Sequence, residues 1–107
     1  GTDKCNEPVW SIYQAMRQHH RIHFVTGRRE SCREDTLYWM EENQIRCPSE
    51  LLFMRKDGDF RHDTDVKPEL IESFKDDIWV IMEDRSSMVG KWRELGHTCV
   101  QVANGDF

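Results

Sequence analysis

The sequence lacks several features that would assign it a simple role. Its longest uninterrupted apolar run is the five residues Ile78–Met82, far short of a membrane span. Its four cysteines form no Cys-x-x-Cys pair, so neither a zinc site nor a redox motif is signalled, and we expect free thiols in a reducing, cytoplasmic setting. No Gly-x-x-x-x-Gly-Lys-Ser/Thr stretch occurs, which excludes a P-loop from these residues. The net charge of -5 at pH 7 argues against wrapping a long nucleic-acid backbone, although a local basic cluster could hold one phosphorylated end.

What the sequence does contain is a regular alternation of short apolar blocks and amphipathic stretches. At 107 residues the chain is predicted to form one domain, residues 1–107. The alternation of strand and helix signals predicts an α/β fold, in which helices cover both faces of a parallel sheet. Strands are expected at Ile22–Val25, Leu51–Met54, Ile78–Met82 and Thr98–Val102.

Four helices are expected from capping and periodicity signals, one before the first strand and one in each of the three intervals between strands. They begin at Asn6-Glu7-Pro8, at Glu34 or Asp35, at Thr64 or Asp65 with Pro68 in the first turn, and at Ser86 or Ser87 with Leu95 facing inward and Gly96 as the C′ residue. Ile78–Met82 is expected to be the most deeply buried strand, because five consecutive apolar residues suit a strand covered on both faces. Trp39, Trp79 and Trp92 are predicted to be core residues.

Polar groups with phosphate chemistry follow three of the predicted strands. Thr26-Gly27-Arg28 comes directly after Ile22–Val25 and offers a hydroxyl, an accessible main chain and a fixed positive fork. Lys67 lies in the helix after the second strand, and Glu83-Asp84 follows the third. Because ligands of open α/β sheets bind beyond the carboxyl ends of the strands, these groups could converge on one crevice. The first stretch also fits an ordinary strand that ends in a glycine turn.

A hydroxyl, an ammonium group and a pair of acids suit phosphoryl transfer through an acyl-phosphate. Thr26 and Lys67 would neutralise phosphate oxygens, and Glu83 and Asp84 would hold Mg²⁺ by hard oxygen ligands. His19, His20 and His23 are not expected to bind a metal, since the first two are adjacent at a helix end.

Four blocks of sequence, taken together, resemble one known family. They are Phe24–Arg28, the loop Asp57-Gly58-Asp59-Phe60-Arg61-His62-Asp63 before Val66-Lys67, Met82-Glu83-Asp84-Arg85 with Trp92-Arg93, and the ending Gln101-Val102-Ala103-Asn104-Gly105-Asp106-Phe107. In order and spacing they look like the phosphatase domain of phage polynucleotide kinase–phosphatases, within the haloacid dehalogenase-like superfamily. The resemblance covers nearly the whole chain and implies a three-layer, Rossmann-like sheet.

The resemblance also implies a function and roles for individual residues. It implies Mg²⁺-dependent removal of a 3′-phosphate from a nucleic-acid end or a nucleotide. Thr26, Lys67 and Asp84 would be catalytic, and Asp84 with Glu83 would hold the metal. Substrate binding would involve Gly27, Arg28, Arg61 and Asp63, with Asp63 also helping to hold the lysine.

One family feature is missing from these residues. The superfamily carries its nucleophile in an Asp-x-Asp motif at the end of a first, central strand, and no apolar strand followed by Asp-x-Asp occurs here. We therefore expect a sheet truncated at the N-terminus, whose central strand is missing or is supplied by an upstream segment or a second chain. The isolated chain is expected to be inactive.

Two other functions are compatible with the same residues. The first is a non-catalytic module that binds phosphorylated nucleic-acid ends through Thr26, Arg28 and Lys67. The second is a signalling receiver domain, which ranks lower because it requires an acidic pair after the first strand and a lysine after the last. Here the lysine begins a helix and the acids follow a late strand.

Overall fold

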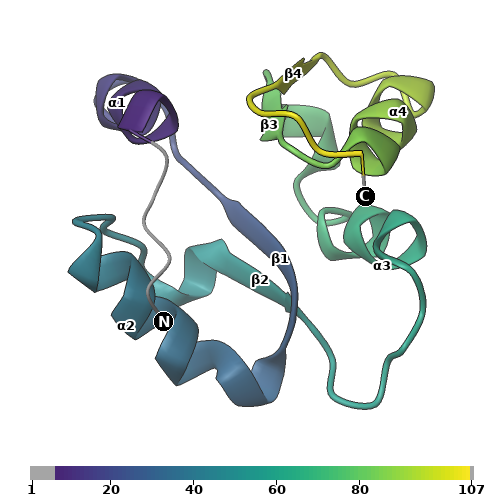
Figure 1. The fold of residues 1–107 in the computed structure, drawn as a ribbon, viewed down its shortest axis with the longest axis horizontal. Coiled ribbons are helices and arrows are strands. Elements are labelled where there is room, and N and C mark those ends of the chain that lie inside the picture. The colour runs from purple at the N-terminus through teal and green to yellow at the C-terminus, as the bar shows by residue number, and fades with distance from the viewer. Residues whose placement is uncertain (1–6, 107) are drawn as a thin grey trace. The chain divides into compact units, whose positions relative to one another are not determined.

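The computed structural model describes residues 7–106, which form two compact units, residues 7–59 and residues 60–106 (Figure 1). Each unit contains two helices and one two-stranded parallel sheet. The small α/β fold with parallel strands expected from the sequence is therefore confirmed. Two expectations, the helix cap at Asn6 and the free thiol of Cys5, lie outside the described residues.

The first unit is built from α1 (Glu7–Met16), β1 (Phe24–Arg29), α2 (Arg33–Glu42) and β2 (Leu52–Arg55). Short 3₁₀ turns precede α2 and β2. Strands β1 and β2 pair in parallel and in step from Phe24 to Thr26, and the register shifts between Thr26 and Arg29. The predicted strand Ile22–Val25 is thus displaced: β1 begins two residues later and runs on through the Gly27-Arg28 pair.

One apolar cluster joins all four elements of this unit. Its buried members are Tyr13 of α1, Met40 of α2, Leu52 and Met54 of β2, and Ile45. Trp10, Phe24, Leu37 and Trp39 pack against it. Helix periodicity on α1 and α2 and alternation along β2 direct these side chains to one apolar cluster.

Arg33, the first residue of α2, ties that helix to the start of β2. Its guanidinium donates to both carboxylate oxygens of Glu30 at 2.8 and 2.9 Å, to the carbonyl and hydroxyl of Ser49, and to the Leu52 carbonyl at 2.8 Å. The guanidinium of Arg33 therefore has a structural role, because its planar fork of N–H donors can reach all these acceptors at once.

The second unit is built from α3 (Asp63–Leu70), β3 (Ile81–Glu83), α4 (Ser86–Glu94) and β4 (Cys99–Gln101). Strands β3 and β4 pair in parallel, with Ile81 opposite Cys99 and Glu83 opposite Gln101. Helix α4 contacts α3 and both strands (Figure 1). The buried side chains are Val66, Ile71, Met88, Val89, Trp92 and Cys99.

Turn chemistry in this unit follows the sequence signals. Gly96 has φ +93° directly after the C-cap of α4, so it is the predicted C′ glycine in the left-handed conformation. Gly58, in the turn before the unit begins, has φ +84°. Both positions favour glycine because a Cβ is disfavoured there.

Several predictions in the second unit were wrong, including the capping of α4 by Ser86 or Ser87, since Arg85 is at the N-cap position, and the core position of Trp79. Helix α3 begins at Asp63 with His62 as its N-cap, so Pro68 falls in the second turn, where it removes one backbone bond, and the helix ends two residues later. Of the predicted strand Ile78–Met82, only the last two residues lie in β3, and Trp79 is 64% exposed. Leu95, expected to face inward, is 47% exposed because it is the C-cap of α4.

Two further features bear on what the sequence excluded. No helix within residues 7–106 is long and apolar enough to cross a membrane. Cys32, Cys47 and Cys99 are free thiols, as predicted.

Candidate functional site at the strand ends

The carboxyl end of β1 is shaped by the irregularity between Thr26 and Arg29. Thr26 pairs with Met54 and Arg29 with Arg55, so Gly27 and Arg28 form an insertion that bulges out of the ladder. The Thr26 hydroxyl accepts a hydrogen bond from the Arg28 N–H at 3.2 Å. The side chain of Arg28 is exposed.

A buried arginine holds this bulge to the next turn of the chain. Arg55 is 8% exposed, and its Nε donates to the Gly27 carbonyl at 2.8 Å while Nη1 donates to the Asp59 carbonyl at 3.0 Å. The Asp57 carboxylate accepts from the Ser31 N–H at 3.1 Å. The loops after β1 and β2 are therefore tied together, which fixes the backbone that carries Thr26.

In the second unit the predicted lysine and one predicted acid form a nearly buried ion pair. Lys67 Nζ lies 3.4 Å from Glu83 Oε1, and the two side chains are 12% and 9% exposed. The indole N–H of Trp92 donates to the same oxygen at 3.3 Å. Because water is largely excluded, this pair restricts the ammonium group of Lys67 to the carboxyl end of β3.

The other carboxylate oxygen of Glu83 shapes the turn into α4. Glu83 Oε2 accepts the backbone N–H groups of Asp84 at 3.1 Å and Arg85 at 3.3 Å. Both oxygens of Glu83 are thus engaged. Asp84 is exposed, and no described residue forms a hydrogen bond or ion pair with its carboxylate.

These contacts distinguish Glu83 from Asp84 as a ligand for a hard cation such as Mg²⁺. A carboxylate without protein partners, as at Asp84, fits Mg²⁺ as one of its oxygen ligands, whereas Glu83 is already committed to Lys67, Trp92 and the turn. Among residues 7–106 no group of three or more His, Cys, Asp or Glu side chains is placed to hold a metal ion. Of the two predicted metal ligands, Asp84 is thus the one whose carboxylate has no protein partner among the described residues.

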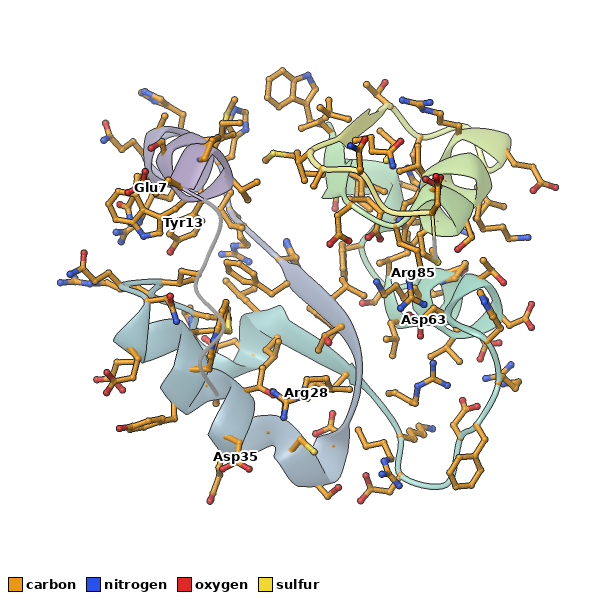
Figure 2. The ribbon with its side chains drawn as sticks, viewed as in Figure 1. Glu7, Tyr13, Arg28, Asp35, Asp63 and Arg85 are labelled. Carbon is orange, nitrogen blue, oxygen red and sulfur yellow. The ribbon has the colours of Figure 1, made fainter. Side chains whose placement is uncertain are left out.

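The remaining predicted residues lie around α3. Asp63, its first residue, accepts from Arg85 Nη1 at 2.9 Å, and Figure 2 shows these two side chains side by side. Asp63 was expected to help hold Lys67, but it forms an ion pair with Arg85, while Lys67 forms one with Glu83. Arg61 forms a two-pronged pair with exposed Glu69, at 2.6 and 3.0 Å.

The structure therefore gathers part of the predicted site. Asp63, Lys67, Glu83 and Asp84 lie at one end of the second unit, while Thr26, Gly27 and Arg28 lie at the strand end of the first unit. Sequence reasoning missed Arg55, whose only signal was an arginine closing an otherwise apolar strand. It also placed Trp92 in the core without foreseeing the bond from its indole to Glu83.

Fold and site together define a class: a small α/β domain with short parallel strands and charged side chains at the carboxyl end of a strand. The family model described as the polynucleotide kinase PNKP phosphatase domain matches residues 1–107, and the chain belongs to this haloacid dehalogenase-like family.

Two solved structures are similar to the chain. A chain in the structure of the Pnkp1/Rnl/Hen1 RNA repair complex matches with a TM-score of 0.90 and 32% sequence identity, over 99% of this chain and 35% of that chain. A chain in a second structure of the Pnkp1/Rnl/Hen1 complex matches with a TM-score of 0.88 and 32% identity, over 99% of this chain and 38% of that chain. The protein thus spans little more than a third of the length of the chains that it matches.

Proposed function

We propose that this chain forms the phosphate-binding part of a Mg²⁺-dependent phosphatase that removes a 3′-phosphate from nucleic-acid ends or nucleotides. The observation that carries the proposal is the nearly buried Lys67–Glu83 pair at the end of β3, where the next residue, Asp84, has a carboxylate without a protein partner among the described residues. A cation and a free carboxylate at one strand end can hold a phosphate dianion and its metal ion together. Membership of the PNKP phosphatase family supports the same function.

Each residue would have a separate role in this reaction. Lys67 would donate to a phosphate oxygen, with Glu83 as the positioning residue that orients its ammonium group. Thr26 and Arg28 would each contact a phosphate oxygen, Thr26 through its hydroxyl and Arg28 through its guanidinium. Asp84 would be one ligand of Mg²⁺, which when bound would offset the charge of the phosphate in the transition state.

The nucleophile would come from outside the described strands. Neither Asp57-Gly58-Asp59 nor Asp63-Thr64-Asp65 follows an apolar strand directly: the first is in a turn, and the second begins α3. The described strands form two ladders, β1–β2 and β3–β4, and none of them is the apolar strand followed by Asp-x-Asp that the family carries. We propose that an upstream segment or a second chain supplies that strand together with an Asp-x-Asp motif.

The test compares the chain alone with the same chain carrying an apolar segment that ends in Asp-x-Asp before Gly1. With Mg²⁺ and either p-nitrophenyl phosphate or a 3′-phosphorylated oligonucleotide, we expect multiple turnovers only from the extended chain. Lys67→Met should then abolish turnover. Lys75→Met is the matched control, because Lys75 forms an exposed Lys–Glu pair with Glu72 at 2.8 Å. Multiple turnovers by the unextended chain would overturn the requirement for an added nucleophile.

A non-catalytic role is the second candidate. The groups that the described residues present, namely a hydroxyl, an arginine and a lysine, bind anions without any need for a nucleophile. Such a module would bind a 3′-phosphorylated oligonucleotide more tightly than its 3′-hydroxyl counterpart and would gain no turnover from the added segment. Sustained turnover by the extended chain excludes this alternative.

A further inference from the structure

The turn that carries Asp84 is held from its other side by the strand β4. Gln101, the last residue of β4, donates from Nε2 to the Asp84 carbonyl at 3.0 Å and to the Ser86 hydroxyl at 3.0 Å. The next residue, Val102, donates its N–H to the Glu83 carbonyl at 3.0 Å. Two successive residues of β4 and its extension therefore bind three positions around the β3–α4 turn.

The segment after β4 also closes the start of α4. Arg85 is the N-cap of this helix, but its side chain makes no capping bond. Instead, the Ser86 N–H donates to the Gly105 carbonyl at 2.6 Å, and the Ser86 hydroxyl lies 3.3 Å from Asp106 Oδ1. The first N–H groups of a helix have no partner within the helix, and one of these, the Ser86 N–H, is thus bound by Gly105 in the segment after β4.

These contacts leave Asp84 little backbone freedom. Its N–H is bound by Glu83 Oε2 and its carbonyl by Gln101 Nε2, so both peptide groups of the residue are held. What remains free is the side chain, which is exposed. A carboxylate that rotates about a fixed Cα samples few positions, and this lowers the entropy lost when it binds a ligand.

The chemistry of the link requires an amide at position 101. The NH₂ group of glutamine has two hydrogens, one for the Asp84 carbonyl and one for the Ser86 hydroxyl, and that hydroxyl can then donate onward to Asp106. A glutamate of the same shape has no donor and would place a negative charge against the carbonyl. Glutamine and glutamate at this position therefore differ in hydrogen bonding but hardly in size.

We propose that Gln101 is a positioning residue: by binding the Asp84 carbonyl and the Ser86 hydroxyl, it holds the backbone of Asp84 where its carboxylate would bind the cation. The inference rests on the proposed function, because it assigns the cation to Asp84. It adds a residue of β4, a strand that carries none of the phosphate-binding or metal-binding residues of the proposed function. The loss of one such bond should weaken Mg²⁺ binding roughly fivefold.

The test compares Gln101→Glu with Gln14→Glu in the chain extended by an Asp-x-Asp segment. Gln14 is a matched control, since its Nε2 also donates to a backbone carbonyl, that of Gln44 at 3.2 Å, but in the first unit. We expect Gln101→Glu to lower kcat at limiting Mg²⁺ with the KM for the 3′-phosphorylated oligonucleotide unchanged. High Mg²⁺ should restore kcat, which a general loss of structure would not allow. Gln14→Glu should change neither quantity.

Amide hydrogen exchange provides a measurement that needs no metal. The Ser86 N–H should exchange faster in Gln101→Glu than in the parent chain, and Ser86→Ala should weaken Mg²⁺ binding in the same direction if Gln101→Glu unfolds. An unchanged Ser86 exchange rate, or a Mg²⁺ dependence equal to that of Gln14→Glu, would overturn the positioning role. Turnover by the extended parent chain without any divalent cation would instead refute the proposed function.

Discussion

Replacing Glu83 by glutamine should destabilise the second unit far more than the small chemical change suggests. One carboxylate oxygen accepts from Lys67 and Trp92, and the other accepts two backbone N–H groups. A glutamine amide has one acceptor and one donor end. In either orientation its NH₂ group would face N–H donors, so Gln cannot satisfy the turn and the lysine together.

The magnitude follows from burial rather than from distance. Removing one partner of a buried ion pair costs about 3–5 kcal/mol because the other charge is left without compensation. Lys67 and Glu83 are 12% and 9% exposed, and glutamine keeps one acceptor, so we expect about 3 kcal/mol for Glu83→Gln. That is a large part of the total stability of a small domain, about 5–15 kcal/mol.

The assay is urea unfolding followed at the Trp92 indole N–H resonance, because this group reports on the pair directly. Glu72→Gln is the control: its pair with Lys75 is shorter, at 2.8 Å, yet both side chains are exposed. We expect its unfolding midpoint to match the parent chain, since exposed pairs contribute little. The double variant Glu83→Gln, Lys67→Met should recover much of the loss, because it leaves no buried charge unpaired. Equal midpoints for Glu83→Gln and Glu72→Gln would refute the reasoning.

Three further predictions concern stability. His62→Ala should destabilise α3 by about 1 kcal/mol, because the ring nitrogen of His62, the N-cap residue, accepts a hydrogen bond from the Thr64 N–H. In thermal unfolding, His62→Asn should restore most of the loss, and an unchanged midpoint for His62→Ala would contradict this prediction. Arg33→Lys should lower the urea unfolding midpoint of the first unit, since an ammonium group cannot make the several hydrogen bonds of the planar guanidinium. A midpoint equal to that of the parent chain would show that these hydrogen bonds do not contribute to stability. Burial, and to a smaller extent the charge of Arg21, lower the pKa of His23 below 6.5. The unfolded chain therefore binds the proton more readily than the folded chain, so the contribution of His23 to the free energy of unfolding is fully present above pH 6.5 and is lost as the pH falls through the folded pKa. His23→Gln should flatten that part of the stability–pH curve, and an unchanged curve would contradict the assignment.

The local elements were predictable where one periodicity dominates. The apolar spacing of Val9, Tyr13 and Met16 indicated α1, and the Gly96 signal marked the end of α4. The prediction of a buried strand at Ile78–Met82 was wrong because five consecutive apolar residues form such a strand only if other elements cover both of its faces. In the structure, β3 has a single strand partner among the described residues, β4, and Trp79 remains largely exposed.

The proximity of Lys67 and Glu83 was predictable from the sequence, but the nature of their contact was not. The predicted alternation placed Lys67 after the second strand and Glu83 after the third, where both could reach one crevice, and in the structure they form an ion pair within one compact unit. It could not show that Glu83 is committed to Lys67 and Trp92, because that depends on the packing of α3 and α4 against β3. It also gave no sign that Gln101 reaches the turn at Asp84, a contact between residues 17 positions apart.

The division into two parallel ladders has a consequence for how the chain folds. Each ladder closes inside one continuous stretch, β1 with β2 before Asp59 and β3 with β4 after Phe60. During synthesis the first crossover can form before the second has left the ribosome, and neither has to wait for a distant partner strand.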